Sequence, residues 1–461
     1  MQEVEGYSEA GAPSERDWTK GSVIRNLLSL SWPIVASNVL HLLGPIVPMI
    51  WVGRLGAASI AGLGVANSVA ALLTVSGMMG FTIGARAIIA RFVGAGDTSG
   101  ANHVARQAFI VSATYGAVVT ATGIIFTVPI LNLFRLETDV VAEGAAYMRI
   151  IFTGSIIVCL RYMAEGIMQA SGDAVTPMKI AALFRILHAL LCPFLILGWW
   201  IFTPLGISGA AIIDIASHGL GLVVIMWVLL SGRSRLKLTL RDFYLDLNTI
   251  WRIVRIGIPA SVMSIQTNLG GLMLTRLMVP FGTLAVAAHS IVQRINMILE
   301  RPSISLGMAA GVLVGQNLGA GQPERAEKSG WLGVSLVEGF MLICAVAILL
   351  WAESIVRIFT HIHSIIEITG VFLRIAVAGY LVLGFSAVLQ HSISGAGDAV
   401  PPMLISLLMI WVIQLPLAFL LPQVTNLDVY GVRWAMVIGL VVGAVAYTIY
   451  FHLGRWKRKK V

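Results

Sequence analysis

The sequence has little charge and little cysteine for its length. Only 11% of its 461 residues are charged, whereas 57% are hydrophobic, and the mean hydropathy is +0.88. So few charged side chains cannot cover the surface of a water-soluble protein of this size, which excludes the ordinary soluble classes. The cysteines, Cys159, Cys192 and Cys344, each lie inside an apolar segment. They therefore indicate neither a disulfide framework nor a cysteine metal site, and we expect small buried hydrophobic side chains.

Several functional motifs are also missing. The formal net charge is +9, but the lysines and arginines lie between apolar segments without interleaved aromatic residues, which argues against a nucleic-acid partner. There is no Walker-type phosphate loop, and the histidines show no metal-ligand spacing, so nothing in the sequence supports an enzyme, a metal site or an organic cofactor. Residues 1–15 are polar and have no apolar core, so we expect no signal peptide.

Long apolar segments dominate what is present. Windows of roughly 20 uncharged residues recur along the chain, the length that an α-helix needs to cross about 30 Å of hydrocarbon. The stretch 113–131 is apolar on every side, whereas a barrel strand would alternate. We therefore predict an all-α integral membrane protein with twelve transmembrane helices. The expected spans are 27–52, 58–84, 104–131, 143–170, 176–200, 207–230, 250–278, 284–316, 329–351, 365–393, 401–421 and 431–453.

Basic residues collect on one side of this predicted topology. That side includes the loop 231–249 and the tail 454–461, whereas the opposite loops hold mainly Arg54, Arg135 and Arg357. Because positively charged loops remain on the cytoplasmic side, we expect both termini in the cytoplasm and the chain in the plasma or inner membrane, in contact with the lipid bilayer.

An internal repeat divides the chain. The segment Gly172–Met178 returns as Gly397–Met403 with one mismatch, at an offset of 225 residues, and Gly94-Ala95-Gly96 returns as Gly319-Ala320-Gly321 at the same offset. An offset of six spans preserves orientation, so we predict two parallel, pseudo-symmetric six-helix lobes. We expect Asp173 in the first copy, and its counterpart in the second, to cap the following helix. The predicted units are an N-terminal segment 1–26, an N-lobe 27–230, a linker 231–249, a C-lobe 250–453 and a basic tail 454–461.

Three motifs carry a family resemblance. They are Trp51-Val52-Gly53-Arg54-Leu55-Gly56, the segment Val314–Gly321, and the repeated Gly-Asp turns. With them the chain resembles the multidrug and toxic compound extrusion (MATE) family, in a superfamily that also contains lipid-linked oligosaccharide flippases. The resemblance implies a V-shaped pair of lobes with alternating access. It implies export of small amphipathic, often cationic organic compounds by a functional monomer, with H+ or Na+ as coupling ion.

The acids that this family often uses are absent here. The corresponding positions hold Pro48, Cys192, Thr267 and Leu383, and the Asn place on the fifth span holds His188. An acid does occur on the sixth span, where Asp214 occupies the Thr place of the family pattern Gly-x-x-Gly-Ala-Ala-x-x-Thr.

The spacing of polar residues predicts a coupling site in the N-lobe. Arg185, His188 and Cys192 share one face of the fifth span, and Asp214 and His218 share one face of the sixth. We predict that Asp214 and His188 form a site able to change protonation state. The alternative is a static ion pair between Arg185 and Asp214.

The second lobe offers weaker candidates. Glu300 is the candidate coupling acid there, although the neighbouring Arg301 could simply neutralise it. The candidates for lining a substrate cavity are Gln266, Asn268, Gln293, Asn296, Arg185 and Arg294. The amides could instead form hydrogen bonds between helices.

Two further interpretations concern the arginines. Glu165 follows Arg161 by one helical turn and is expected to form an ion pair with it. A flippase for a lipid-linked sugar would need a cationic interior, and Arg161, Arg185, Arg276 and Arg294 keep that alternative open.

Overall fold

The structure is a computed structural model that describes residues 17–200, 203–239, 241 and 243–459. The predicted N-terminal segment up to residue 16, and residues 460 and 461 of the basic tail, lie outside this part of the chain. Within it every regular element is a helix. The prediction of an all-α protein is confirmed.

The helices form two lobes of six spans each. The first lobe contains α1 (Val23–Val52), α2 (Ala57–Ala70), the π-helical turn η1 (Ala71–Ser76), α3 (Gly77–Gly94), α4 (Thr98–Leu133), α5 (Thr138–Thr153), α6 (Ser155–Ser171), α7 (Val175–Leu197) and α8 (Gly206–Ser231). The second contains α9 (Leu247–Met278), the short η2 (Val279–Phe281), α10 (Thr283–Gly319), α11 (Pro323–Arg357), α12 (His363–Tyr380), α13 (Leu383–Gly395), α14 (Val400–Leu407), the π-helical turn η3 (Leu408–Gln414), α15 (Leu415–Val424) and α16 (Val429–His452), which is followed by η4 (Arg455–Arg458).

Twelve spans account for these helices. Ten described helices are long and apolar enough to cross a membrane, and the bent pair of α5 and α6 makes an eleventh. The twelfth is α9, which is less apolar and carries Arg252, Arg255 and Arg276. The twelve-span prediction is confirmed, and most predicted ends lie within a few residues of the observed ones.

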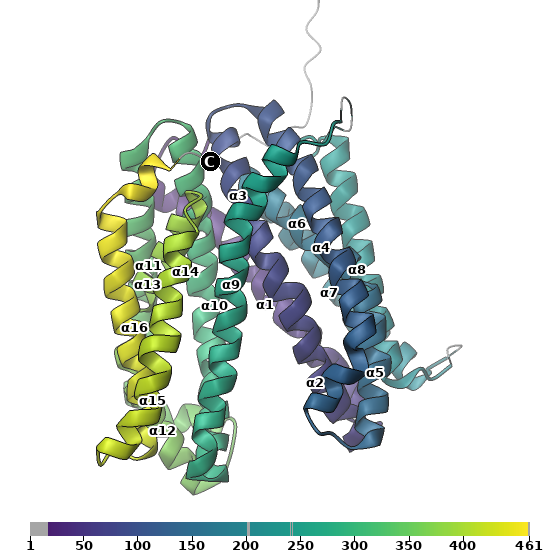
Figure 1. Cartoon of the computed structure of the whole chain (residues 1–461), viewed down its shortest axis with the longest axis vertical. Helices are drawn as coiled ribbons and strands as arrows, with labels where there is room; N and C mark the ends of the chain where they lie inside the picture. Colours follow the sequence, from purple (N-terminus) through teal and green to yellow (C-terminus); the bar gives the residue numbers. More distant parts are fainter. Residues whose placement is uncertain (1–16, 201–202, 240, 242, 460–461) are drawn as a thin grey trace, which may run out of the picture.

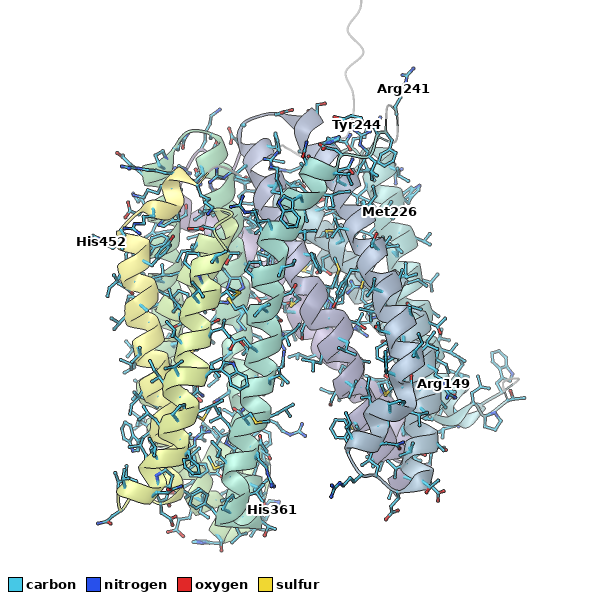
Figure 2. The ribbon with its side chains drawn as sticks, in the orientation of Figure 1. Arg149, Met226, Arg241, Tyr244, His361 and His452 are labelled. Atoms are coloured by element: carbon cyan, nitrogen blue, oxygen red, sulfur yellow. The ribbon has the colours of Figure 1, made fainter. Side chains whose placement is uncertain are left out.

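The lobes meet at one end of the molecule. Figure 1 shows that they approach each other where α1 begins and α16 ends, and diverge toward the opposite end. We call the first the closed end and the second the far end. Figure 2 places Arg241 and Tyr244 of the loop between the lobes at the closed end and His361 at the far end.

Two predicted spans are broken rather than continuous. The span 143–170 is divided at Gly154, where α5 and α6 meet at an angle of 51°. A β-carbon at Gly154 would lie 2.5 Å from the side chain of Ile215 on α8, so glycine permits this close packing. The repeat-related span 365–393 is divided between Tyr380 and Leu383. Hydropathy cannot reveal such breaks, because both halves of each span remain apolar.

The first helix of each lobe packs into the core of the other lobe. Leu27, Leu30 and Ile34 of α1 belong to a buried cluster made mainly of second-lobe residues. Reciprocally, Ile253 and Ile256 of α9 belong to a cluster made mainly of first-lobe residues. The contact between the lobes is therefore a shared hydrophobic core.

Glycines at repeat-related positions seal the closed end. A β-carbon at Gly94 would overlap the carbonyl oxygen of Gln316, and one at Gly319 would overlap the carbonyl oxygen of Arg91. Because 91 and 94 correspond to 316 and 319 at the offset of 225, the two contacts are reciprocal, as expected about a pseudo-twofold axis. Side-chain hydrogen bonds also cross the interface here, from Arg91 Nη2 to the Ala396 carbonyl at 2.9 Å and from Gln316 Nε2 to the Ala170 carbonyl at 2.8 Å.

The two Gly-Asp turns share a backbone but differ in their hydrogen bonds. Gly172 and Gly397 have φ of 94° and 87°. Asp173 accepts a hydrogen bond from the backbone N–H of Thr176 at 3.0 Å, as predicted. The capping prediction for Asp398 was wrong, since its carboxylate instead pairs with Lys459 Nζ at 3.1 Å and accepts from the Tyr450 hydroxyl. The reason is the mismatch in the repeat: Pro401 replaces Thr176 and has no N–H to donate.

Removing the cap of α7 is expected to destabilise the protein modestly. Asp173→Ala leaves the Thr176 N–H without its partner and should lower the free energy of unfolding by about 1 kcal/mol. Unfolding of the purified protein in detergent measures the change. The matched control is Glu137→Ala, because Glu137 precedes α5 without a side-chain cap bond, and it should change stability by less than about 0.5 kcal/mol. Equal losses in the two variants would contradict the capping role.

Candidate functional site

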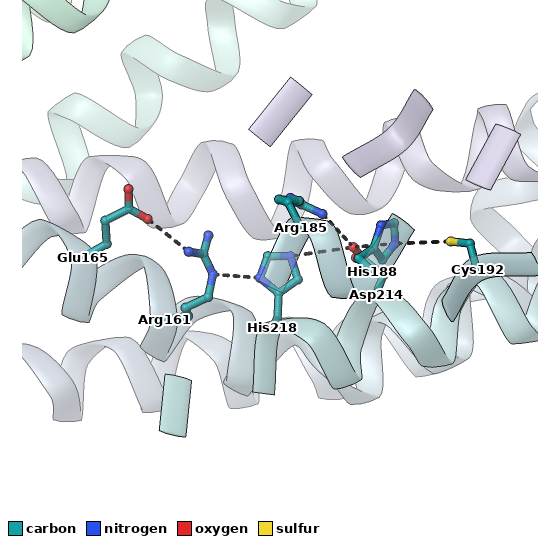
Figure 3. Close-up of polar contacts among 7 residues, drawn as sticks. All are labelled: Arg161, Glu165, Arg185, His188, Cys192, Asp214 and His218. Atoms are coloured by element: carbon teal, nitrogen blue, oxygen red, sulfur yellow. Dashed lines mark hydrogen bonds and ion pairs between the residues drawn. The ribbon is translucent and has the colours of Figure 1, made fainter. Parts of the chain in front are cut away.

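Asp214 lies at the centre of a polar cluster inside the first lobe. Its Oδ1 is 3.4 Å from Nη1 of Arg185, 3.7 Å from Nε2 of His188 and 3.8 Å from Nε2 of His218. The side chain of Asp214 is 24% exposed, whereas the three partners are buried. The polar faces that the sequence predicts on α7 and on α8 meet in the structure (Figure 3).

The hydrogen bond from Arg161 determines which ring nitrogen of His218 carries the proton. Arg161 Nε donates to His218 Nδ1 at 2.7 Å, so that ring nitrogen carries a lone pair. A neutral His218 therefore carries its proton on Nε2, which faces Asp214. His188 is less constrained, because its Nδ1 is buried without a hydrogen-bond partner and its Nε2 is 3.8 Å from the Cys192 sulfur.

A second carboxylate ends the cluster on the side of the closed end. Glu165 Oε2 accepts from Arg161 Nη1 at 3.1 Å, which is the i, i+4 ion pair expected from the sequence. The same oxygen is 3.7 Å from His41 Nε2 of α1. Four helices thus contribute to one connected set of side chains, namely His41, Arg161, Glu165, Arg185, His188, Asp214 and His218.

Aromatic and backbone packing hold the two guanidinium groups. Those of Arg161 and Arg185 lie 4.9 Å and 5.0 Å from the ring of Phe184, which is buried. A β-carbon at Gly44 on α1 would lie 2.6 Å from Arg185 Nη1. Glycine therefore allows α1 to pack directly on this charge. The two carboxylates balance the two guanidinium groups, so the set is neutral while its histidines are neutral.

The second-lobe candidates do not form a comparable cluster. Glu300 and Arg301 are half-buried neighbours on α10, and Arg294 is exposed. Asn296 donates to Gln293 Oε1 at 3.3 Å and accepts from the hydroxyl of Tyr380 on α12. These amides therefore take part in contacts within and between helices.

The remaining amide candidates also bond to other helices. Gln266 donates to Ser406 Oγ at 2.8 Å and accepts from Trp411 Nε1 at 3.0 Å, which satisfies both ends of its amide. Asn268 donates to Ser76 Oγ of the first lobe at 3.2 Å. Both amides therefore form hydrogen bonds between helices, which is the alternative to a role in lining a substrate cavity.

Comparison with known proteins places the fold in a family. A profile of the MatE family matches residues 33–194 and again residues 259–420, one match in each lobe. Together these segments cover more than half of the chain.

The chain belongs to the MatE family.

Individual relatives agree with this assignment. A protein described as probable multidrug resistance protein NorM, from Thermotoga maritima, is 25% identical across 95% of this chain and 94% of its own. Probable multidrug resistance protein YoeA, from Bacillus subtilis, is 27% identical across 96% of both chains. A crystal structure of MATE in the bent conformation superposes with a TM-score of 0.89 at 23% identity, covering 95% and 96% of the two chains. This MatE-family chain is therefore a multi-span membrane protein of a transporter family, rather than a member of an enzyme family.

At one position where family members often have an acid and this chain does not, the structure brings a carboxylate from another helix. Leu383, at an expected acid position, is the first residue of α13. Its neighbour Gly384 donates its backbone N–H at 2.7 Å to Oε1 of Glu338, which comes from α11. A carboxylate therefore reaches the break between α12 and α13 from another helix. Thr267 stands at another of these positions, and its hydroxyl donates a hydrogen bond to the Met263 carbonyl at 2.8 Å.

Sequence reasoning missed two members of this MatE-family interior. His41 is an isolated polar residue in an apolar span, and this pattern does not indicate which residue it contacts. Its partner Glu165 is 124 positions away in the sequence. Glu338 has no charged partner within one helical turn along its own helix, so the sequence suggests only a position near a lobe surface, and its contact with Gly384 could not be predicted. In the described part of the chain, no group of three His, Cys, Asp or Glu side chains has an arrangement that suits a metal ion.

Proposed function

We propose that this MatE-family protein is a secondary active exporter of amphipathic organic compounds, driven by inward movement of protons through alternating access. The descriptions of NorM and YoeA as probable multidrug resistance proteins support the substrate class. The observation that carries the coupling proposal is the position of Asp214, a partly exposed carboxylate held inside the lobe by three nitrogen groups. Ionisable residues inside a membrane commonly mark pathways along which protons are gained and lost.

The geometry supports a link between protonation and helix movement. A proton on Asp214 would remove the charge that balances Arg185, 3.4 Å away. A buried guanidinium without its counter-charge is unfavourable, so Arg185 would move toward water or another acceptor. Because Gly44 packs on the Arg185 guanidinium, that movement would also free or displace α1. His188 would exchange the proton with Asp214 across 3.7 Å.

The surroundings of Asp214 favour protons over sodium ions. Hard metal cations take several oxygen ligands. Around Asp214 Oδ1 the nearest charged or titratable partners are the guanidinium of Arg185 and the imidazoles of His188 and His218. Arginine cannot act as a ligand and repels a cation, so this arrangement suits a proton.

The proposal includes orientation and organisation. The closed end holds the loop between the lobes and the basic tail, so we place it in the cytoplasm of a cell membrane, with both termini there. The structure then corresponds to a protein whose lobes are apart on the outer side. We retain the units 1–26, 27–230, 231–249, 250–453 and 454–461, and a functional monomer, as parts of the proposal.

Transport by purified protein in liposomes tests this function. We expect uptake or release of a fluorescent organic cation to respond to an imposed pH gradient, and Asp214→Asn to reduce that response to the level of liposomes without protein. The matched control is Glu353→Gln, since Glu353 is an exposed acid of the second lobe paired with Arg374. Transport driven by a sodium gradient alone, or unchanged coupling in Asp214→Asn, would contradict the proton mechanism.

Two of the four arginines that kept the flippase alternative open are neutralised in the structure. Arg161 and Arg185 are each paired with a carboxylate, so neither offers a free charge for a pyrophosphate head group. Arg276 and Arg294 are exposed. We keep the exporter as the single proposed function because the descriptions of the relatives support it.

A further inference from the structure

Arg433 is a buried cation of the second lobe without a carboxylate partner. It lies about 6 Å along α16 from the start of that helix and is 2% exposed. Its Nη1 is 3.3 Å from His289 Nδ1 on α10 and 3.4 Å from the Met436 sulfur. The arginine ion pairs in the described part of the chain are those of Arg161, Arg185 and Arg374. Arg433 forms none.

Two buried hydrogen-bond donors are left over beside this contact. Arg433 Nε and His289 Nε2 both lack a hydrogen-bond partner. Arginine has donors only, so the bond between the two residues runs from Arg433 to His289 Nδ1. A neutral His289 must then carry its proton on Nε2. Both orphan atoms are therefore donors, and the group that would satisfy them is an acceptor.

The charge balance points in the same direction. Arginine remains charged at any pH that a protein experiences, and an unpaired buried charge costs several kcal/mol. The ring of Phe372 on α12, 5.3 Å from the guanidinium, offsets part of this cost. Glu300 is the acid candidate on α10, but it is eleven residues from His289, or about 16 Å along the helix. It is too distant to neutralise Arg433.

We propose that Arg433 and His289 bind a small, singly charged anionic group between α10, α12 and α16. The group is either a chloride ion or the carboxylate of a transported solute, since each supplies one negative charge and accepts several N–H donors. This site is separate from the Asp214 cluster and lies in the other lobe, so it goes beyond the proposed function. It also stands if the proton coupling proposed for Asp214 fails.

The thermal stability of the full-length protein in detergent distinguishes the two sources. Unfolding is followed by tryptophan fluorescence at constant ionic strength, while a bulky sulfonate salt is replaced by sodium chloride or by sodium benzoate. We expect a saturable rise in the unfolding temperature with at least one of these anions. A response to chloride assigns the site to the ion, and a response to benzoate alone assigns it to the carboxylate of a solute.

Variants show whether the response belongs to Arg433. Arg433→Gln should weaken the apparent anion affinity by at least about tenfold, equivalent to about 1.4 kcal/mol, and should be no less stable than the natural protein in the sulfonate salt. Arg374→Gln, which removes a paired and exposed arginine, and Asp214→Asn should keep the response. The proposal is overturned if neither anion acts or if Arg433→Gln responds equally. It is also overturned if Arg433→Gln fails to fold where Arg374→Gln folds.

Discussion

Arg161→Ala is expected to cause a large loss of stability, about 3 to 5 kcal/mol. The substitution removes the ion pair to Glu165 at 3.1 Å and the donor to His218 at 2.7 Å. It leaves the buried Glu165 carboxylate in contact with the more distant His41 and the amide of Gln169, with Arg86 as a nearby cation that remains. Equilibrium unfolding in mixed micelles measures the loss, which should exceed that of any single cap in this protein.

Two companion variants separate this effect from simple loss of packing. In Arg161→Ala/Glu165→Gln the orphaned charge is also removed, so a substantial part of the lost stability should return. Arg374→Ala breaks an exposed ion pair, with side chains 45% and 51% exposed, and should cost less than about 1 kcal/mol. A loss in Arg161→Ala no larger than in Arg374→Ala would show that the cluster tolerates an unpaired acid.

Gly94→Val is expected to separate the lobes at the closed end. Its side chain would occupy the position of the Gln316 carbonyl, and overpacking of this kind costs about 1 to 3 kcal/mol or more. That cost shifts the equilibrium between conformations by about tenfold to a hundredfold. Ala87 is buried on α3, where its carbonyl faces Gly315 of the second lobe. Labelling of a cysteine introduced at Ala87, after replacement of the native cysteines, should therefore accelerate, and transport should fall. The reciprocal variant Gly319→Val should act in the same way.

Glycines in open surroundings provide the control for this experiment. Nothing lies within 4 Å of a β-carbon built at Gly64 or Gly271. Gly64→Ala and Gly271→Ala should therefore leave both labelling and transport unchanged, and could raise helix stability slightly. Labelling in Gly94→Val as slow as in these controls would show that the contact between Gly94 and Gln316 does not hold the lobes together at the closed end.

The sequence predicts the architecture well because the bilayer imposes simple constraints. Apolar length sets the spans, and the return of Gly172–Met178 at Gly397–Met403 shows the two lobes. Helical spacing also places His188 with Arg185 on one face of its helix and Asp214 with His218 on one face of the next. The packing of α7 on α8 then brings His188 Nε2 to 3.7 Å from Asp214 Oδ1.

Contacts between distant helices could not be predicted in this way. Glu338 reaches Gly384 only because the tenth span breaks there, and neither the break nor the neighbour is encoded in local periodicity. Asp398 differs from Asp173 because of one proline in the repeat, a difference that is visible in the sequence once the backbone donor is considered. The pairing of Arg433 with His289 joins residues 144 positions apart.

The exchange of first helices between lobes has a consequence for biosynthesis. Leu27 and Leu30 emerge early from the ribosome, but the side chains that bury them belong mainly to helices made after Ser231. The first turns of α1 therefore remain without most of their packing partners, in the membrane or at its surface, until the second lobe is inserted. The two halves must therefore complete their folding together. In a chain arrested after the sixth span, the apolar start of α1 would stay exposed, because the side chains that bury it belong to the missing half.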